Sequence, residues 1–226
     1  MSYQEYARQI IENYTETDAE SRNLLVDAVK DLRIKRVLDV GCGAGQEMIP
    51  FAEKRGAFCV GIDIGKELGD VGKTFVETLN YSDKIKFVRA EGEDLPFADE
   101  SFDVVLCRVA LPYMNNKKVI AETARVLRPG GVYLLKTHAP AFYFGMLKRR
   151  FTTFSLRQYA YPVICLINGI RHQATGKQTR KGIWKGKEVF QTRSFLEKEL
   201  KKNGLRIEGV LPDTNIQSPS FFIVKS

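Results

Sequence analysis

The chain has 226 residues and a formal net charge of +8, with 44% hydrophobic and 27% charged residues. This composition excludes disordered, collagen-like and fibrous proteins. The length is enough to bury one sizeable core, so we expect a single domain over residues 1–226 rather than two independent ones.

The sequence shows neither the pattern of a secretory signal nor that of a membrane-spanning helix. Residues 1–20 are polar and acidic, and no run reaches the roughly 18 apolar residues of a membrane-spanning helix. The four cysteines lie far apart without a Cys-x-x-Cys pair or clustered histidines. We therefore expect a cytoplasmic protein with free thiols, no disulfide framework and no metal site.

The positive charge is concentrated in one part of the chain. Residues 1–135 contain 18 Lys and Arg against 22 Asp and Glu, whereas residues 136–202 contain 15 against 3. An anionic partner is therefore expected to meet the later segment.

The N-terminal part has helical patterning over 3–14 and 19–32. Short apolar runs rich in β-branched residues then alternate with segments of helical spacing, which is typical of a parallel sheet. The predicted strands are 36–40, 58–62, 85–89, 102–107 and 131–136. The predicted helices are 46–55, 67–79 and 117–127, the last followed by a Pro129-Gly130 stop.

The C-terminal part predicts one more helix and two more strands. Ser194 to Glu197 fits a capping box, the helix continues through Leu200, and Gly204 stands where a C-cap glycine belongs. The strands 205–211 and 221–225 are expected to form an antiparallel hairpin at the sheet edge. The predicted fold is therefore α/β, with a doubly wound, mostly parallel seven-stranded sheet.

Residues 139–191 do not fit this alternation. The segment is rich in aromatic and basic side chains, and its length of about fifty residues is too great for a simple loop. We predict an inserted cap, whose aromatic side chains supply apolar walls and whose cations can hold a carboxylate or phosphate.

A glycine-rich turn follows the first predicted strand and opens the next helix. Its glycines are Gly41, Gly43 and Gly45, so the backbone can turn sharply and approach a ligand closely. A dinucleotide fingerprint has G-x-G-x-x-G spacing, but here the third glycine comes one residue earlier, and Gln46 stands in its usual place. The spacing argues against a nicotinamide cofactor.

An acidic residue, Asp63, lies at the end of the second predicted strand. A carboxylate in this position can accept hydrogen bonds from both hydroxyls of a ribose, although a solvated loop acid is the alternative. Its place directly after an apolar strand favours the binding role.

The stretch 37–135 resembles the class I S-adenosylmethionine-dependent methyltransferases, especially their small-molecule branch, also called methyltransferase type 11. Beyond the glycine loop and Asp63, three further motifs agree with that branch in order and spacing. They are Glu91-Gly92-Glu93-Asp94-Leu95-Pro96-Phe97, Ser101-Phe102-Asp103-Val104-Val105-Leu106 and Leu127-Arg128-Pro129-Gly130-Gly131.

The resemblance implies a Rossmann-like fold and S-adenosylmethionine as methyl donor, with S-adenosylhomocysteine as product. Asp63 would hold the ribose, Ile64 would pack on the adenine and Glu91 would accept from its amine. The backbone at Gly92 and Glu93 would meet the ring edge. The methionine end of the cofactor would lie among Asp39, Gly41, Cys42, Gly43 and Gly45, with the backbone of Cys107 and Arg108 near its amino group.

Methyl transfer from a sulfonium needs the acceptor and the methyl group held in line, and a base only if the acceptor loses a proton. His138 follows the fifth strand and is the candidate base, with a structural hydrogen-bonding role as the alternative. Arg108 either reaches an anionic substrate or pairs with a carboxylate. Tyr113, Arg149 and Arg150 are the other candidate substrate residues.

We expect a small amphipathic or anionic acceptor, covered by residues 139–191, and N-terminal helices within 1–32 that cover the cofactor cleft. Because aromatic and basic side chains also bind nucleic acid, RNA methylation is the second enzymatic reading. The apolar stretch 159–170 fits either a buried helix or a membrane-surface contact. A non-catalytic partner subunit that keeps the cofactor fold is the third reading.

Overall fold

The computed structural model describes residues 5, 9, 12–14, 19–150, 156–178 and 182–226. Its centre is a seven-stranded sheet in the order β3-β2-β1-β4-β5-β7-β6. The strands are β1 Arg36–Val40, β2 Phe58–Asp63, β3 Ile85–Arg89, β4 Phe102–Arg108, β5 Leu127–Lys136, β6 Leu205–Val210 and β7 Ser220–Lys225. β1 to β5 pair in parallel, whereas β7 pairs antiparallel with both β5 and β6. This arrangement confirms the predicted fold, including the hairpin at the edge.

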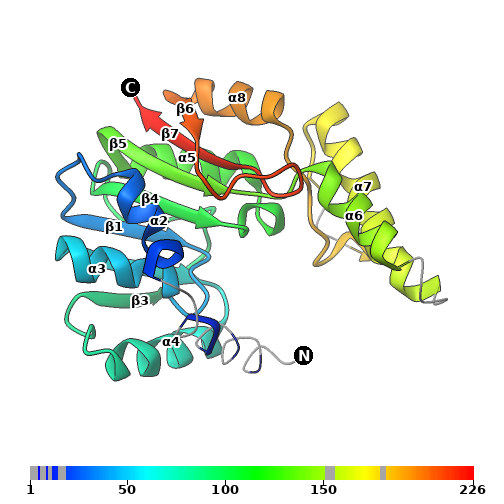
Figure 1. Cartoon of the computed structure of the whole chain (residues 1–226). Coiled ribbons are helices and arrows are strands. Elements are labelled where there is room, and N and C mark those ends of the chain that lie inside the picture. Colours follow the sequence, from blue (N-terminus) through cyan, green and yellow to red (C-terminus); the bar gives the residue numbers. More distant parts are fainter. Residues whose placement is uncertain (1–4, 6–8, 10–11, 15–18, 151–155, 179–181) are drawn as a thin grey trace.

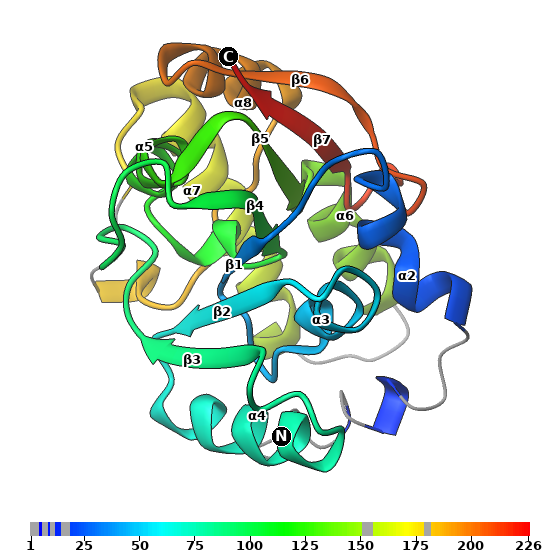
Figure 2. The same ribbon diagram turned by 90° about the vertical axis from the view of Figure 1, so that its left-hand side faces the viewer.

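Helices cover both faces of the sheet (Figures 1 and 2). The helices are α2 Ala19–Ala28, α3 Ile49–Arg55, α4 Lys66–Thr78, α5 Asn116–Val126, α6 Pro140–Arg150, α7 Leu156–Thr175 and α8 Arg193–Lys202. Three short 3₁₀ turns accompany them among the described residues: η1 Gln46–Met48, η2 Leu111–Tyr113 and η3 Gly182–Trp184.

The sheet separates two apolar cores. On one face Val26 of α2, Phe51 of α3 and Phe75 of α4 pack in the same buried cluster. On the other face Ile120 of α5 and Leu196 of α8 belong to a second cluster. Because both faces are covered, the central strands are buried on both sides, which is why each reads as a continuous apolar run in the sequence.

Two predicted boundaries differ from the structure. Helix α8 begins after Thr192, whose hydroxyl accepts a hydrogen bond from the backbone N–H of Phe195 at 3.3 Å. Ser194 is therefore not the cap, and Glu197 pairs with Arg193 at 2.7 Å instead of closing a capping box. Strand β5 already begins at Leu127, so the Pro129-Gly130 pair lies within a strand rather than in a turn after the helix.

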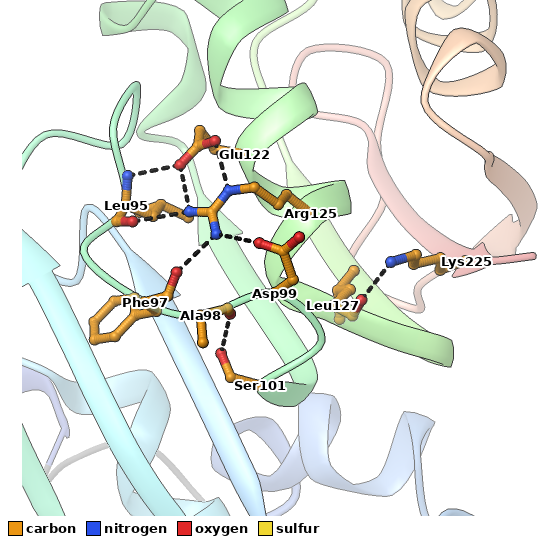
Figure 3. A network of polar contacts seen from close by, with 9 residues as sticks. All are labelled: Leu95, Phe97, Ala98, Asp99, Ser101, Glu122, Arg125, Leu127 and Lys225. Carbon is orange, nitrogen blue, oxygen red and sulfur yellow. Dashed lines mark hydrogen bonds and ion pairs between the residues drawn. The ribbon is translucent and has the colours of Figure 1, made fainter.

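The sequence motif around Leu95 to Phe97 is held against α5 by one arginine (Figure 3). Arg125 donates to the carbonyl of Leu95 at 2.9 Å and to that of Phe97 at 2.7 Å. The same guanidinium pairs with Glu122 at 2.7 Å and with Asp99 at 2.8 Å. These contacts fix the loop that leads from the predicted adenine edge into β4.

Replacing Arg125 with methionine is expected to lower the free energy of unfolding by about 2 kcal/mol, because two loop carbonyls and two carboxylates lose their shared donor. Lys118→Met on the same helix is the matched control, since Lys118 is exposed, and is expected to change stability by less than about 0.5 kcal/mol. Urea unfolding of both variants measures the difference. Equal losses in the two variants would show that the network does not hold the loop.

Helices α6 and α7 extend from the side of the sheet toward which the arrow of β4 points (Figure 1). They occupy most of the segment predicted as an inserted cap, and a small buried cluster of Tyr143, Cys165 and Phe190 joins them to the segment that leads into α8. None of the described helices combines the length and the hydropathy that crossing a membrane requires.

Candidate active site

The glycine loop between β1 and η1 adopts the left-handed backbone that its sequence predicts. Gly41, Gly43 and Gly45 have φ angles of 74°, 54° and 83°, a region that residues with a side chain rarely occupy. A methyl group on Gly41 would also overlap the side chain of Ala110, and one on Gly45 would lie 2.7 Å from Phe87. No atom lies within 4 Å of the position a Cβ would take on Gly43, so that side of the loop is open.

Asp63 at the end of β2 is tied to this loop. One carboxylate oxygen accepts from the backbone N–H of Gly65 at 2.9 Å, and the other faces the N–H of Gly43 at 3.4 Å. The half-buried side chain lines a pocket of about 220 Å³. The other residues of this pocket are Cys42, Gly61, Gly65, Asp70, Lys73, Phe87, Val88 and Arg89.

Asp39 in β1 is a buried carboxyl group, 2% exposed, beside the glycine loop. Burial raises its pKa well above the usual value, the nearby Glu47 raises it further, and Arg108 opposes both. No described residue donates a hydrogen bond to it or forms an ion pair with it. Buried polar groups are normally paired, so a cationic ligand group beside Asp39 would supply the missing partner.

The predicted adenine edge is open where a ring could lie. Ile64 is 61% exposed directly after Asp63, and Glu91 is exposed as well. A Cβ on Gly92 would lie 2.9 Å from Val40, so this position requires glycine. The carboxylate of Glu93 accepts from the backbone N–H of Asn115 at 2.7 Å and thereby joins this loop to the start of α5.

The last two residues of β4 are a buried thiol, Cys107, and a paired cation, Arg108. Cys107 is fully buried, and burial raises the pKa of its thiol to about 12, so the group is an inert small side chain. Arg108 pairs with Asp213 and donates to the hydroxyl of Ser220 at 2.6 Å. Of the two interpretations left open for Arg108, carboxylate pairing is therefore the one found in this structure.

Four residues form hydrogen bonds with one buried carboxylate, Glu188, at the carboxyl end of the sheet. Nδ1 of His138 lies 2.6 Å away, and the hydroxyl of Tyr113 donates at 2.9 Å. The hydroxyls of Tyr143 on α6 and Tyr161 on α7 donate at 2.8 and 2.5 Å. Glu188 therefore joins both helices to the ends of β4 and β5.

The charge state of this cluster follows from its hydrogen bonds. Burial alone would raise the pKa of Glu188, but the hydrogen bonds from His138, Tyr161 and Tyr143 lower it below the usual value of 4.5. Burial and the Glu188 charge raise the pKa of Tyr113, Tyr143 and Tyr161, so these remain donors. Glu188 is thus an ionised acceptor at neutral pH.

The two histidines have different surroundings. His138 is 7% exposed, with its ring stacked on Phe142 at 3.6 Å between centroids. Nδ1 faces Glu188, and no described residue forms a hydrogen bond with Nε2. His172 is 1% exposed, and within the described part of the chain neither ring nitrogen has a hydrogen-bond partner; burial lowers its pKa, so it is a neutral core residue.

Some predicted residues are exposed on α6, and others lie outside the description. Arg149 is exposed near the end of α6, while the side chain of Arg150 and most of the predicted helix 3–14 lie outside the described residues. Tyr14 packs edge-to-face on Phe75 of α4 at 5.5 Å, on the α4 side of the sheet.

Sequence analysis missed Glu188, because its partners are separated from it by 27 to 75 positions. The signal that could have identified it is charge: Glu188 is the single acidic residue between positions 136 and 192. An isolated acid among many cations and aromatics is expected to have a specific partner.

Comparisons with known proteins agree with this geometry. Residues 38–135 match a family model described as a methyltransferase domain. The uncharacterized methyltransferase YcgJ of Bacillus subtilis is 33% identical over 122 residues, which make up 54% of this chain and 47% of YcgJ. Demethylmenaquinone methyltransferase of Renibacterium salmoninarum is 35% identical over 145 residues, which make up 63% of this chain and 56% of that protein. The chain thus spans about half the length of these curated relatives.

The solved structures share the fold. Geranyl diphosphate C-methyltransferase from Streptomyces coelicolor, in complex with Mg²⁺, geranyl diphosphate and S-adenosyl-L-homocysteine, has a TM-score of 0.66 at 13% identity. The similarity covers 98% of this chain and 84% of that one. Together with the sheet order, this likeness shows that the chain shares the fold of the class I methyltransferases, and residues 38–135 are similar to a methyltransferase domain.

Proposed function

We propose that this protein transfers a methyl group from S-adenosylmethionine to a small amphipathic or anionic acceptor. The observation that carries the proposal is Asp39, a buried carboxyl group without a described partner, next to a glycine loop that is open at Gly43. The donor brings an ammonium and a sulfonium, and either cation is a suitable neighbour for Asp39.

The residues present would hold the cofactor at both of its ends. Asp63 would accept from the ribose hydroxyls, and the exposed Ile64 would pack on the adenine. Gly92 and Glu93 would present backbone to the ring edge, and Cys107 and Arg108 would line the amino end. When bound, S-adenosylmethionine supplies an activated methyl group, so the protein has mainly to orient the acceptor and exclude water.

The acceptor would lie between the carboxyl ends of β4 and β5 and the cap, which we assign to residues 139–191. His138 would take a proton from an acceptor that loses one, because its Nε2 has no described partner while Glu188 fixes the ring through Nδ1. Tyr113 is 47% exposed at the same place and would contact the acceptor through its ring.

The class of acceptor is inferred from charge and from relatives. Demethylmenaquinone and geranyl diphosphate, which appear in the names of relatives, each combine an apolar body with a polar or charged part. The cap offers the same combination of aromatic walls and cations. Arg149 and Arg150 are the proposed contacts for an acceptor anion.

The proposal is tested by incubating the protein with S-adenosylmethionine labelled in its methyl group. One panel contains prenylated and aromatic carboxylates and phosphates, and a second contains RNA. Label in the organic extract of the first panel is expected, with none in RNA. Label in RNA alone would contradict the small-molecule assignment, and the absence of label from both panels despite cofactor binding would favour a non-catalytic partner subunit.

A further inference from the structure

Helix α7 buries one face and exposes the opposite one. Cys165 on the buried face packs with Tyr143 of α6. On the other face Val163, Ile167 and Ile170 are 40%, 50% and 62% exposed. Their spacing of three and four residues puts them on one side of the helix, where Ala160 and Ala174 extend the row in both directions. We call Ala160, Val163, Ile167, Ile170 and Ala174 the apolar stripe.

The apolar stripe has only positive charge in the sequence around it. Residues 136–192 contain eleven Lys and Arg but a single acid, Glu188, which is 2% exposed and already bonded to His138. The described cations of this segment with exposed side chains are Lys148, Arg149, Arg171, Lys177 and Lys185. This segment of the chain therefore combines exposed aliphatic side chains with a strong excess of positive charge.

An aromatic turn lies beside the C-terminal half of the apolar stripe. The guanidinium of Arg171 lies 6.0 Å from the ring centre of Trp184, so η3 is adjacent to α7 near Ile170. In the same turn Ile183 is 67% exposed. Trp, Arg and exposed aliphatic residues in this combination are typical of surfaces that lie at the boundary between lipid headgroups and acyl chains.

We propose that the apolar stripe of α7 docks on the surface of a bilayer that contains anionic lipid. Charge complementarity selects this partner: the aliphatic side chains enter the headgroup boundary while the surrounding cations meet lipid phosphates. A second copy of the chain would bring like charges together. Nucleic acid would satisfy the cations but would leave Val163, Ile167 and Ile170 in water.

The position of the stripe suits such contact. In Figure 1 helices α6 and α7 lie at one side of the sheet, and the side chains of Val163, Ile167 and Ile170 on α7 are exposed to solvent. The buried face of the same helix carries Tyr161, whose hydroxyl is bonded to Glu188 beside His138. Docking would therefore place the candidate acceptor site next to the membrane, where an amphipathic acceptor is concentrated.

The proposal is tested with the full chain and vesicles of phosphatidylcholine, with and without phosphatidylglycerol, in a sedimentation assay. Binding is expected only with phosphatidylglycerol, and is expected to weaken as salt is raised. The double variant Ile167→Glu, Ile170→Glu is expected to lower the partition coefficient about tenfold or more, because each change puts a charge into the headgroup boundary. Ile216→Glu is the matched control, since Ile216 is 82% exposed in the loop between β6 and β7 rather than on α7, and it should bind as the unchanged chain does.

Both variants should retain the thermal unfolding temperature and the S-adenosylhomocysteine affinity of the unchanged chain, because all three residues are exposed. This readout separates the docking surface from the proposed catalysis, which vesicle binding does not require. Equal binding by the double variant and the control would overturn the proposal. So would a lack of vesicle binding, whether the stripe then proves to mediate self-association in light scattering or the segment binds single-stranded RNA.

Discussion

The Asp63→Ala variant is expected to bind S-adenosylmethionine about thirtyfold more weakly, a loss of about 2 kcal/mol. The carboxylate would accept hydrogen bonds from both ribose hydroxyls, and hydrogen bonds to a charged acceptor are among the stronger ones. Its backbone partners, Gly65 and Gly43, hold the carboxylate at the open side of the loop. Calorimetric titration of both proteins measures the difference.

Asp70→Ala is the matched control for this prediction. Asp70 lines the same pocket and is exposed, but it lies on α4 rather than at the end of β2. Its removal is expected to change the affinity less than threefold, as for a surface charge. If the two variants bound the cofactor equally well, the ribose assignment of Asp63 would be wrong.

Glu188→Ala is expected to lower the free energy of unfolding by about 3 kcal/mol, because a buried imidazole and three tyrosine hydroxyls lose one shared acceptor. Glu188→Gln retains one carbonyl acceptor and should cost less. Glu197→Ala, which breaks an exposed pair with Arg193, is the control and should cost less than about 1 kcal/mol. Urea unfolding at neutral pH compares the three variants.

The contribution of Glu188 is expected to depend on pH. Because the hydrogen bonds from His138, Tyr161 and Tyr143 lower the folded-state pKa below the usual 4.5, ionised Glu188 stabilises the fold above 4.5. That contribution is lost as the pH falls from 4.5 through the folded-state value. The stability difference between the unchanged chain and Glu188→Gln should therefore shrink in acid. A constant difference down to low pH would mean that the pKa of Glu188 is the same in the folded and the unfolded chain.

The sheet could be predicted from the sequence because parallel strands buried on both faces read as short apolar runs. The strands 36–40 and 85–89 have the predicted bounds, and Gly204 has the left-handed φ of 68° expected after a helix. The antiparallel hairpin of β6 and β7 was also predicted correctly. Sequence patterns within single segments therefore predicted most of the fold.

The errors came from competition between neighbouring signals. Thr192 and Ser194 are both good N-cap residues, and the helix uses the earlier one, which pairs with Phe195. Pro129 and Gly130 look like a turn, but strand pairing of Leu127 with Phe102 draws this segment into β5. Local propensity alone does not rank such alternatives.

The candidate site divides in the same way. The ends of β1 and β2 position three motif residues that are close to them in sequence, Asp39, Gly43 and Asp63. Their proximity in the fold could therefore be predicted. Glu188 meets His138 only because the segment before α8 returns to the carboxyl end of β5, which no local pattern indicates. The roles of these residues in binding and catalysis stay predictions.

The central claim is that the glycine loop, Asp39 and Asp63 form a site for S-adenosylmethionine. Calorimetric titration of the purified chain with S-adenosylmethionine, S-adenosylhomocysteine and NAD tests it most directly. We predict micromolar binding of the first two and no binding of NAD. Binding of NAD alone, or of none of the three by a chain that is folded, would contradict the account.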